Sequence, residues 1–117
     1  MTKMKNIEET SFRPKVYFID IDETICHYPE THALDDVKDY SLAIPNSYYI
    51  DRINFLYDQG HTVVYWTARG SRSKINWLAF TAEQLKNWGA RYSQLRCDKP
   101  YYDVFVDDRT LNSIDQL

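Results

Sequence analysis

The chain has 117 residues, of which 44% are hydrophobic and 26% are charged, and its formal net charge at pH 7 is -3. This length fits one domain with a buried core and leaves no room for a second. The small negative charge disfavours tight nonspecific binding to nucleic acid or to an anionic membrane. The sequence shows no signal peptide or long apolar span, and its two cysteines, Cys26 and Cys97, fit a reducing environment, so we expect a cytoplasmic protein.

The start of the chain predicts a tail and then a strand. Residues 1–14 mix charged and small polar side chains without periodicity and close at Pro14, so we expect a flexible tail ahead of a single domain at residues 15–117. Residues 15–19 are apolar and rich in strand formers, which predicts a strand buried on both faces. This strand runs directly into Asp20.

The next part of the chain predicts a loop, a helix and a second strand. Residues 26–45 have no sustained period, so we expect a loop or short hairpin in which His27 and His32 are solvated and have no assigned role. Residues 46–60 place apolar side chains at three- and four-residue steps between an asparagine cap and a glycine, which predicts a helix. Residues 62–66 predict a buried strand followed by a polar turn.

The last part of the chain predicts a further helix and further strands. Residues 74–88 have apolar positions at helical spacing and a glycine just beyond them, which is typical of a helix. Residues 95–97 predict a short strand and residues 102–106 a longer one. We expect residues 112–117 to form a short terminal helix.

Strands and helices alternate along the chain, which predicts an α/β fold with a three-layer, Rossmann-like parallel sheet and helices on both of its faces. In such sheets, ligands bind beyond the carboxyl ends of the strands. Two of the predicted strands end in paired acids, and the strand at 62–66 ends in a polar turn. We therefore expect these side chains to converge on one edge of the sheet: Asp20, Asp22, Thr67, Asp107 and Asp108.

Four carboxylates at one edge would repel one another, and the simplest remedy is a hard divalent cation held by oxygen ligands. Mg²⁺ accepts a few aspartate ligands, keeps several waters and favours phosphate. The sequence has no histidine or cysteine cluster of the kind that holds zinc. We therefore expect Mg²⁺ as the cofactor.

A phosphate ester at such a site gives the predicted side chains separate roles. Asp20 can attack phosphorus in line and form an aspartyl-phosphate, which water then hydrolyses. Asp22 can protonate the departing alcohol and then activate the water. Thr67 can hold phosphate oxygens, and Lys99 can neutralise the charge on the transferred group. Arg69 can bind substrate or pair with a surface acid, and the sequence leaves both open.

The motifs in this order resemble those of the haloacid dehalogenase (HAD) superfamily of phosphohydrolases, from about residue 15 to residue 109. The matching elements are Asp20-Ile21-Asp22-Glu23-Thr24, similar to the DxDxT motif, then Thr67, Lys99 and the pair Asp107-Asp108. The resemblance implies that Asp20 is the nucleophile and a magnesium ligand, and that Asp22 is the acid and base with its backbone carbonyl also on magnesium. It implies that Asp107 completes the metal site. It leaves Asp108 as a direct ligand or as a partner of one.

Residues 66–70 and 99–108 are similar to small, cap-less phosphatases of capsule and sugar-phosphate metabolism. Many relatives continue for at least one more strand after the fourth motif, whereas this sequence stops at Leu117, so we expect the sheet edge to be missing or supplied by a partner. No segment is long enough to form a cap domain. A homo-oligomer could cover the site, and the 15% aromatic content would suit its interface. The resemblance thus implies a phosphomonoester hydrolase acting on a sugar phosphate or a similar small metabolite.

Other functions fit parts of the pattern. Residues 106–110 also resemble the phosphatase half of polynucleotide kinase-phosphatases, which act on 3'-phosphate ends, although the net negative charge weighs against nucleic acid. A receiver domain of signalling proteins shares the length, the acidic metal site and the phospho-accepting aspartate. It places its acid pair after the first strand and its acceptor aspartate after a middle strand, which is not the order in this sequence.

Overall fold

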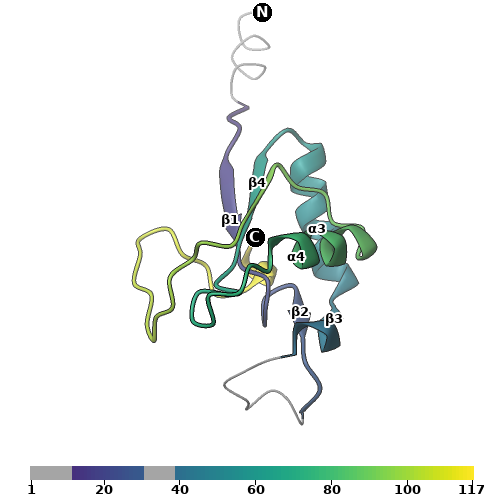
Figure 1. The fold of residues 1–117 in the computed structure, drawn as a ribbon. Coiled ribbons are helices and arrows are strands. Elements are labelled where there is room, and N and C mark those ends of the chain that lie inside the picture. The colour runs from purple at the N-terminus through teal and green to yellow at the C-terminus, as the bar shows by residue number, and fades with distance from the viewer. Residues whose placement is uncertain (1–11, 31–38) are drawn as a thin grey trace, which may run out of the picture.

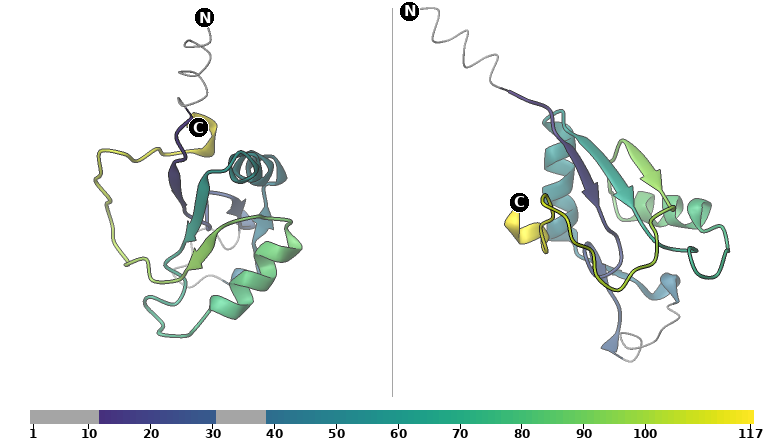
Figure 2. Two further views of the ribbon diagram at one scale, coloured as in Figure 1. Left: turned by 90° about the horizontal axis from the view of Figure 1, so that it is seen from above. Right: turned by 90° about the vertical axis from the view of Figure 1, so that its left-hand side faces the viewer.

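The computed structural model describes residues 12–30 and 39–117. Its main sheet has three parallel strands, β1 (Val16–Ile19), β4 (Thr62–Trp66) and β5 (Gln94–Arg96), in the order β1-β4-β5. Figure 1 labels β1 and β4, and Figure 2 shows β5 beside β4. The three parallel strands confirm the predictions made for residues 15–19, 62–66 and 95–97, with small shifts of their ends. The chain therefore has an α/β fold built on a parallel sheet.

Two α-helices lie in the described part of the chain. Helix α3 (Ser47–Asp58) begins after Asn46, whose side chain accepts a hydrogen bond from the Tyr49 amide at 3.0 Å, as its sequence predicts. Helix α4 (Leu78–Asn87) begins four residues later than the prediction of residue 74. The reason is local, because Lys74 has a positive φ of 65° and donates its amide to the Gly70 carbonyl at 2.9 Å in a turn.

Both α-helices lie on the same side of the sheet (Figure 2). The strand order explains this, because the chain moves in one direction across the sheet from β1 to β5, and right-handed crossovers then place every connecting helix on one face. The predicted arrangement with helices on both faces is thus not found among the described residues. A helix on the second face requires a crossover back past β1, and no α-helix of the described residues follows β5.

The core lies between the sheet and the two helices. Its buried members come from β1, the turn after it, β2 (Cys26–His27) and the residue that follows it, α3, β4, α4 and the C-terminal segment: Ile19, Ile21, Ile25, Cys26, Tyr28, Ile50, Ile53, Val63, Tyr65, Leu85 and Ile114. On the opposite face of β1, Val16 is 63% exposed and Phe18 is 49% exposed. The prediction that this strand is buried on both faces is therefore wrong, because β1 is an edge strand whose outer face has no covering layer among residues 12–30 and 39–117.

The remaining elements are short. Strands β2 (Cys26–His27) and β3 (Ile44–Pro45) pair in antiparallel fashion, which agrees with the predicted hairpin, and the 3-10 turn η1 (Tyr40–Leu42) precedes β3. A second 3-10 turn, η2 (Ile114–Gln116), takes the place of the predicted terminal helix. Residues 12–30 and 39–117 contain no helix that is long and apolar enough to cross a membrane.

The strand predicted at residues 102–106 does not form. This segment runs away from the sheet as part of the long C-terminal loop, drawn in yellow-green in Figure 2. Its apolar side chains face solvent, with Val106 89% exposed. Strand propensity alone cannot make a strand, because the backbone groups of a strand need a paired neighbour.

Candidate active site

The ends of the three parallel strands bring the central residues of the site together. Asp20 follows β1 directly, Thr67 follows β4 directly, and Lys99 comes three residues after β5. Two backbone hydrogen bonds tie these segments, from Thr67 N to the Arg96 carbonyl at 2.9 Å and from Lys99 N to the Thr67 carbonyl at 3.2 Å. All three residues line one cavity of about 750 Å³, and for Asp20 and Thr67 this agrees with the sheet-edge prediction.

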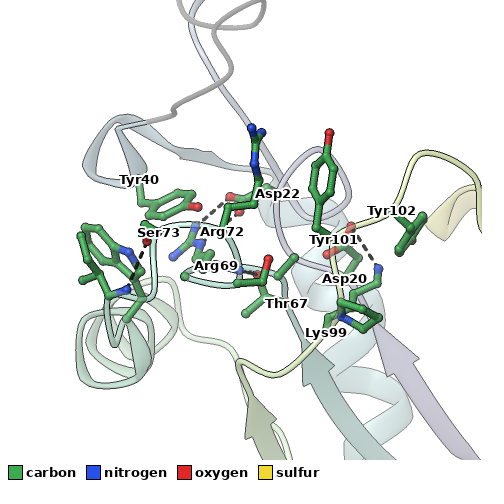
Figure 3. A pocket seen from close by; sticks show the side chains of 16 residues that line it. Asp20, Asp22, Tyr40, Thr67, Arg69, Arg72, Ser73, Lys99, Tyr101 and Tyr102 are labelled. Carbon is green, nitrogen blue, oxygen red and sulfur yellow. Dashed lines mark hydrogen bonds and ion pairs between the residues drawn. The ribbon is translucent and has the colours of Figure 1, made fainter.

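Asp20 and Lys99 face each other in this cavity (Figure 3). The Lys99 Nζ lies 3.7 Å from the Asp20 Oδ2, and the Asp20 side chain is 38% exposed, so a substrate can reach it. The other carboxylate oxygen accepts a hydrogen bond from the Ile21 amide at 2.8 Å. Partial burial raises the pKa of Asp20 above its ordinary value, and the Lys99 charge and the Ile21 amide oppose this rise.

Asp22 is placed by the turn that leaves β1. The amides of Thr24 and Ile25 donate to the Ile21 carbonyl at 3.1 and 3.0 Å, and the fully buried Ile21 and Ile25 side chains anchor this turn in the core. The Asp22 carboxylate is only 18% exposed. Tyr28 and Cys26 both donate hydrogen bonds to its Oδ1. Asp22 is thus held more tightly than a residue of a solvated turn.

Arg69 is the main partner of Asp22. Its Nε lies 3.0 Å from the Asp22 Oδ2 and its Nη2 lies 2.8 Å from the Asp22 Oδ1, which is a two-point ion pair. The Arg69 side chain is 0% exposed. Of the two roles left open for Arg69, pairing with an acid is therefore the one observed, although the pair is buried and not at the surface. The predicted contact between its guanidinium and a substrate is not available in this arrangement.

Helix α4 and the loop before β3 hold Arg69 in place. Its Nη1 donates to the Thr81 hydroxyl at 3.2 Å and to the Gln84 Oε1 at 2.8 Å, and the Tyr40 ring lies 4.5 Å from its guanidinium carbon. Gln84 in turn donates to the Tyr40 carbonyl at 2.8 Å. Thr81 and Gln84 were not identified from the sequence. The sequence signal that could have identified them is their spacing: they are two polar residues, three positions apart, next to the apolar positions of the predicted helix.

Thr67 is buried at the bottom of the site. Its side-chain oxygen accepts a hydrogen bond from the Arg69 amide at 3.2 Å, while its hydroxyl proton stays available to a phosphate oxygen. The aromatic lining of the cavity, formed by Tyr40, Trp77, Tyr101 and Tyr102, was not predicted as part of the site. His27 does not line the cavity, and His32 lies outside the described residues.

The acidic pair Asp107-Asp108 does not reach the site. Asp107 accepts hydrogen bonds from the Arg109 amide and the Thr110 hydroxyl, Asp108 lies 3.9 Å from the Arg109 side chain, and neither residue lines the cavity. The predicted convergence of four carboxylates is therefore not present in this arrangement. The reason is that residues 102–106 do not pair with the sheet and so do not deliver the acids to its edge.

Among the described residues, acidic side chains do not gather into a metal-binding cluster at this cavity. Within residues 12–30 and 39–117 no group of three or more acidic, histidine or cysteine side chains is close enough to hold a metal ion. Both oxygens of Asp22 are bound by Arg69, which leaves the Asp20 carboxylate alone as an accessible anionic ligand. Magnesium in proteins is usually held by one or two carboxylates together with waters and substrate phosphates, so a second carboxylate would strengthen binding at Asp20.

Comparisons with known proteins give a similar fold and no information about the site. No protein-family model and no curated protein matches the chain. The fold is similar to that of a structural-genomics target protein from Vibrio cholerae, with a TM-score of 0.68 and 23% sequence identity, over 83% of this chain and 82% of the other. At this level of identity the likeness concerns the fold alone.

Proposed function

We propose that the chain is a magnesium-dependent phosphomonoester hydrolase of the HAD type, in which Asp20 is the nucleophile. The observation that carries this proposal is the Asp20 carboxylate itself, which is accessible at the end of β1 and lies 3.7 Å from the Lys99 ammonium in a cavity that also contains Thr67. A cavity of about 750 Å³ is of the size that takes a small phosphorylated metabolite.

The proposed reaction has two displacements at phosphorus. An Asp20 oxygen forms a bond to phosphorus while the bond from phosphorus to the substrate's alcohol oxygen breaks, and that oxygen takes up a proton. Water then attacks the aspartyl-phosphate, gives up a proton, and releases inorganic phosphate and the Asp20 carboxylate. Lys99 offsets the charge of the transferred group, and the Thr67 hydroxyl donates to one of its oxygens.

The acid and base role proposed for Asp22 sets a condition on the site. Arg69 binds both Asp22 oxygens and so favours the ionised carboxylate. For Asp22 to donate a proton to the alcohol, one of its oxygens has to leave Arg69. Binding of the substrate in the cavity next to Asp22 can supply the interactions that replace this contact.

The magnesium site and the full HAD-like sheet depend on the segment at residues 102–106. Strand β1 pairs with β4 along one edge, and the described residues leave its other edge unpaired. Parallel pairing of residues 102–106 with this edge would satisfy its open backbone groups and would place Asp107 beyond the same end of the sheet as Asp20. We therefore include this pairing, and magnesium bound between Asp20 and Asp107, in the proposal.

The test is hydrolysis of p-nitrophenyl phosphate by the purified full chain, with and without Mg²⁺. We expect Mg²⁺-dependent turnover that Asp20→Asn abolishes and that Asp51→Asn, an exposed matched control on α3, leaves unchanged. Borohydride reduction during turnover should mark Asp20 in peptide mass spectra. Full activity of Asp20→Asn would overturn the assignment, and a stable phosphoryl group on the chain without turnover would indicate a phospho-accepting receiver-like domain instead.

A further inference from the structure

The cavity is larger than a phosphate group and carries an additional cation. Three cationic side chains line it, and Arg69 and Lys99 each have a carboxylate partner in Asp22 and Asp20. Arg72 has no acidic partner among residues 12–30 and 39–117. Its guanidinium carbon instead lies 4.7 Å from the centre of the Tyr101 ring. Among the described residues, Arg72 is thus a cavity-lining cation without a carboxylate partner.

The local structure holds Arg72 at this position. Its loop is closed by hydrogen bonds from Ser71 N to the Ala68 carbonyl and from Lys74 N to the Gly70 carbonyl, both 2.9 Å long. Gly70 has a φ of +87°, and a Cβ there would lie 2.2 Å from the Ile75 carbonyl oxygen, so the tight turn requires glycine. The loop that presents Arg72 is therefore a compact turn.

Tyr101 is held from the opposite wall of the cavity. It follows Pro100 and lies two residues from Lys99, whose amide donates to the Thr67 carbonyl. Figure 3 shows the Arg72 and Tyr101 side chains extending side by side, away from Thr67. The proposed pairing with β1 begins at residue 102, after this contact. Arg72 and Tyr101 can therefore stand at the mouth of the cavity while Asp20, Thr67 and Lys99 form its inner end.

A guanidinium that stacks on an aromatic ring keeps its N–H edge free for a planar oxyacid group. Carboxylate and phosphate groups are the ligands that this edge binds with two parallel hydrogen bonds. We propose that Arg72 and Tyr101 bind a second anionic group of the substrate, and that the substrates are phosphomonoesters that carry a carboxylate or a second phosphate. This inference rests on the proposed function, because it assigns the first phosphate to Asp20.

The test compares the binding of size-matched probes and does not depend on turnover. Isothermal titration calorimetry with the Asp20→Asn chain and Mg²⁺ would measure the affinities for glucose 6-phosphate, 6-phosphogluconate and glucose 1,6-bisphosphate. We expect at least one of the two doubly acidic probes to bind about tenfold more tightly than glucose 6-phosphate. Arg72→Gln should remove this preference and leave glucose 6-phosphate binding within about twofold.

Three controls separate the possible outcomes. Arg91→Gln, at an exposed arginine outside the cavity, should keep the preference, and Arg72→Lys should retain only part of it because lysine lacks the planar fork. If only 6-phosphogluconate or only glucose 1,6-bisphosphate binds more tightly, the result identifies the acidic group that Arg72 and Tyr101 bind. Equal binding of all three probes, or equal weakening of all three in Arg72→Gln, would overturn the inference. If the unsubstituted chain does not hydrolyse p-nitrophenyl phosphate but the preference for doubly acidic probes is observed, the result would contradict the proposed function and not this inference.

Discussion

The guanidinium of Arg69 binds both oxygens of the Asp22 carboxylate, at 3.0 and 2.8 Å, and no part of the Arg69 side chain is exposed. This pair joins the segment after β1 to helix α4, because Thr81 and Gln84 bind the same guanidinium. It therefore contributes both to the position of the predicted acid and base and to the packing of the helix on the sheet.

Removal of one partner should destabilise the chain, because the other charge is then left without compensation in a largely buried place. We expect Arg69→Met to lower the free energy of unfolding by about 3 kcal/mol, measured by urea denaturation. The double variant Arg69→Met with Asp22→Asn should recover most of this loss, since both charges are then gone. Arg91→Met, at the exposed pair with Asp58, serves as the control and should change stability little. Wild-type stability of Arg69→Met would show that the pair contributes nothing.

Lys99 should affect both the rate and its dependence on pH. Asp20 has to be ionised to attack, so kcat/KM falls as the pH drops through the pKa of Asp20. Burial raises the pKa of Asp20 and the Lys99 charge opposes this rise, so Lys99→Met should move the acid limb of the profile to higher pH. We also expect kcat/KM to fall by about 10²-fold.

The matched control for this prediction is Lys86→Met, at an exposed lysine of α4 that does not line the active-site cavity. It should change neither the rate nor the profile. A lower rate in Lys99→Met with an unmoved acid limb would show that Lys99 acts on the substrate without tuning Asp20.

The segment at residues 102–106 should order against the sheet when magnesium binds. Asp107→Asn should raise the Mg²⁺ concentration for half-maximal activity by about tenfold, because the ion loses one of few protein ligands. Asp103→Asn changes the same charge in the same segment and should leave this concentration unchanged. Hydrogen exchange should show slower exchange of residues 103–106 with Mg²⁺ present. Equal effects of the two substitutions would contradict the proposed pairing with β1.

The two free cysteines should react very differently. Burial, with a smaller effect of the Asp22 charge, raises the pKa of Cys26 to about 12, so the reactive thiolate is about one part in 10⁴ at pH 8. We expect iodoacetamide to label Cys97 first and Cys26 only after unfolding, as read by peptide mass spectrometry. Cys97→Ser should remove the fast labelling, and rapid labelling of Cys26 in the native chain would contradict the described turn.

Nucleic-acid ends and small metabolites can be separated directly. The net charge of -3 weighs against binding to a polyanion, so we expect sugar phosphates to be hydrolysed faster than a 3'-phosphorylated oligonucleotide. The measurement is phosphate release from both kinds of substrate at equal concentration and the same ionic strength. Turnover of the oligonucleotide alone would favour an end-healing enzyme.

Local patterns in the sequence were enough to predict most of the helices and strands. Helix α3 was predictable because its signals are local. They are the Asn46 cap, the spacing of the apolar residues and the glycine after the last turn, and all of them act over a few residues. The predicted helix began four residues before α4, because the apolar spacing continued back to Ile75 although the backbone turns at Lys74. The periodicity of apolar residues indicates which side chains can face a core. It does not indicate where the backbone adopts a positive φ.

The sequence by itself determined that Asp20 and Thr67 share one edge of a parallel sheet, because each follows a strand and parallel strands end together, and the motif resemblance added Lys99 to the site. Only the tertiary structure decided that Arg69 is buried against Asp22 and supported by α4, that both helices lie on one face, and that Asp107 lies away from Asp20. These features depend on contacts between segments that are far apart in the sequence. The residues of one segment do not reveal whether the other segment packs against them.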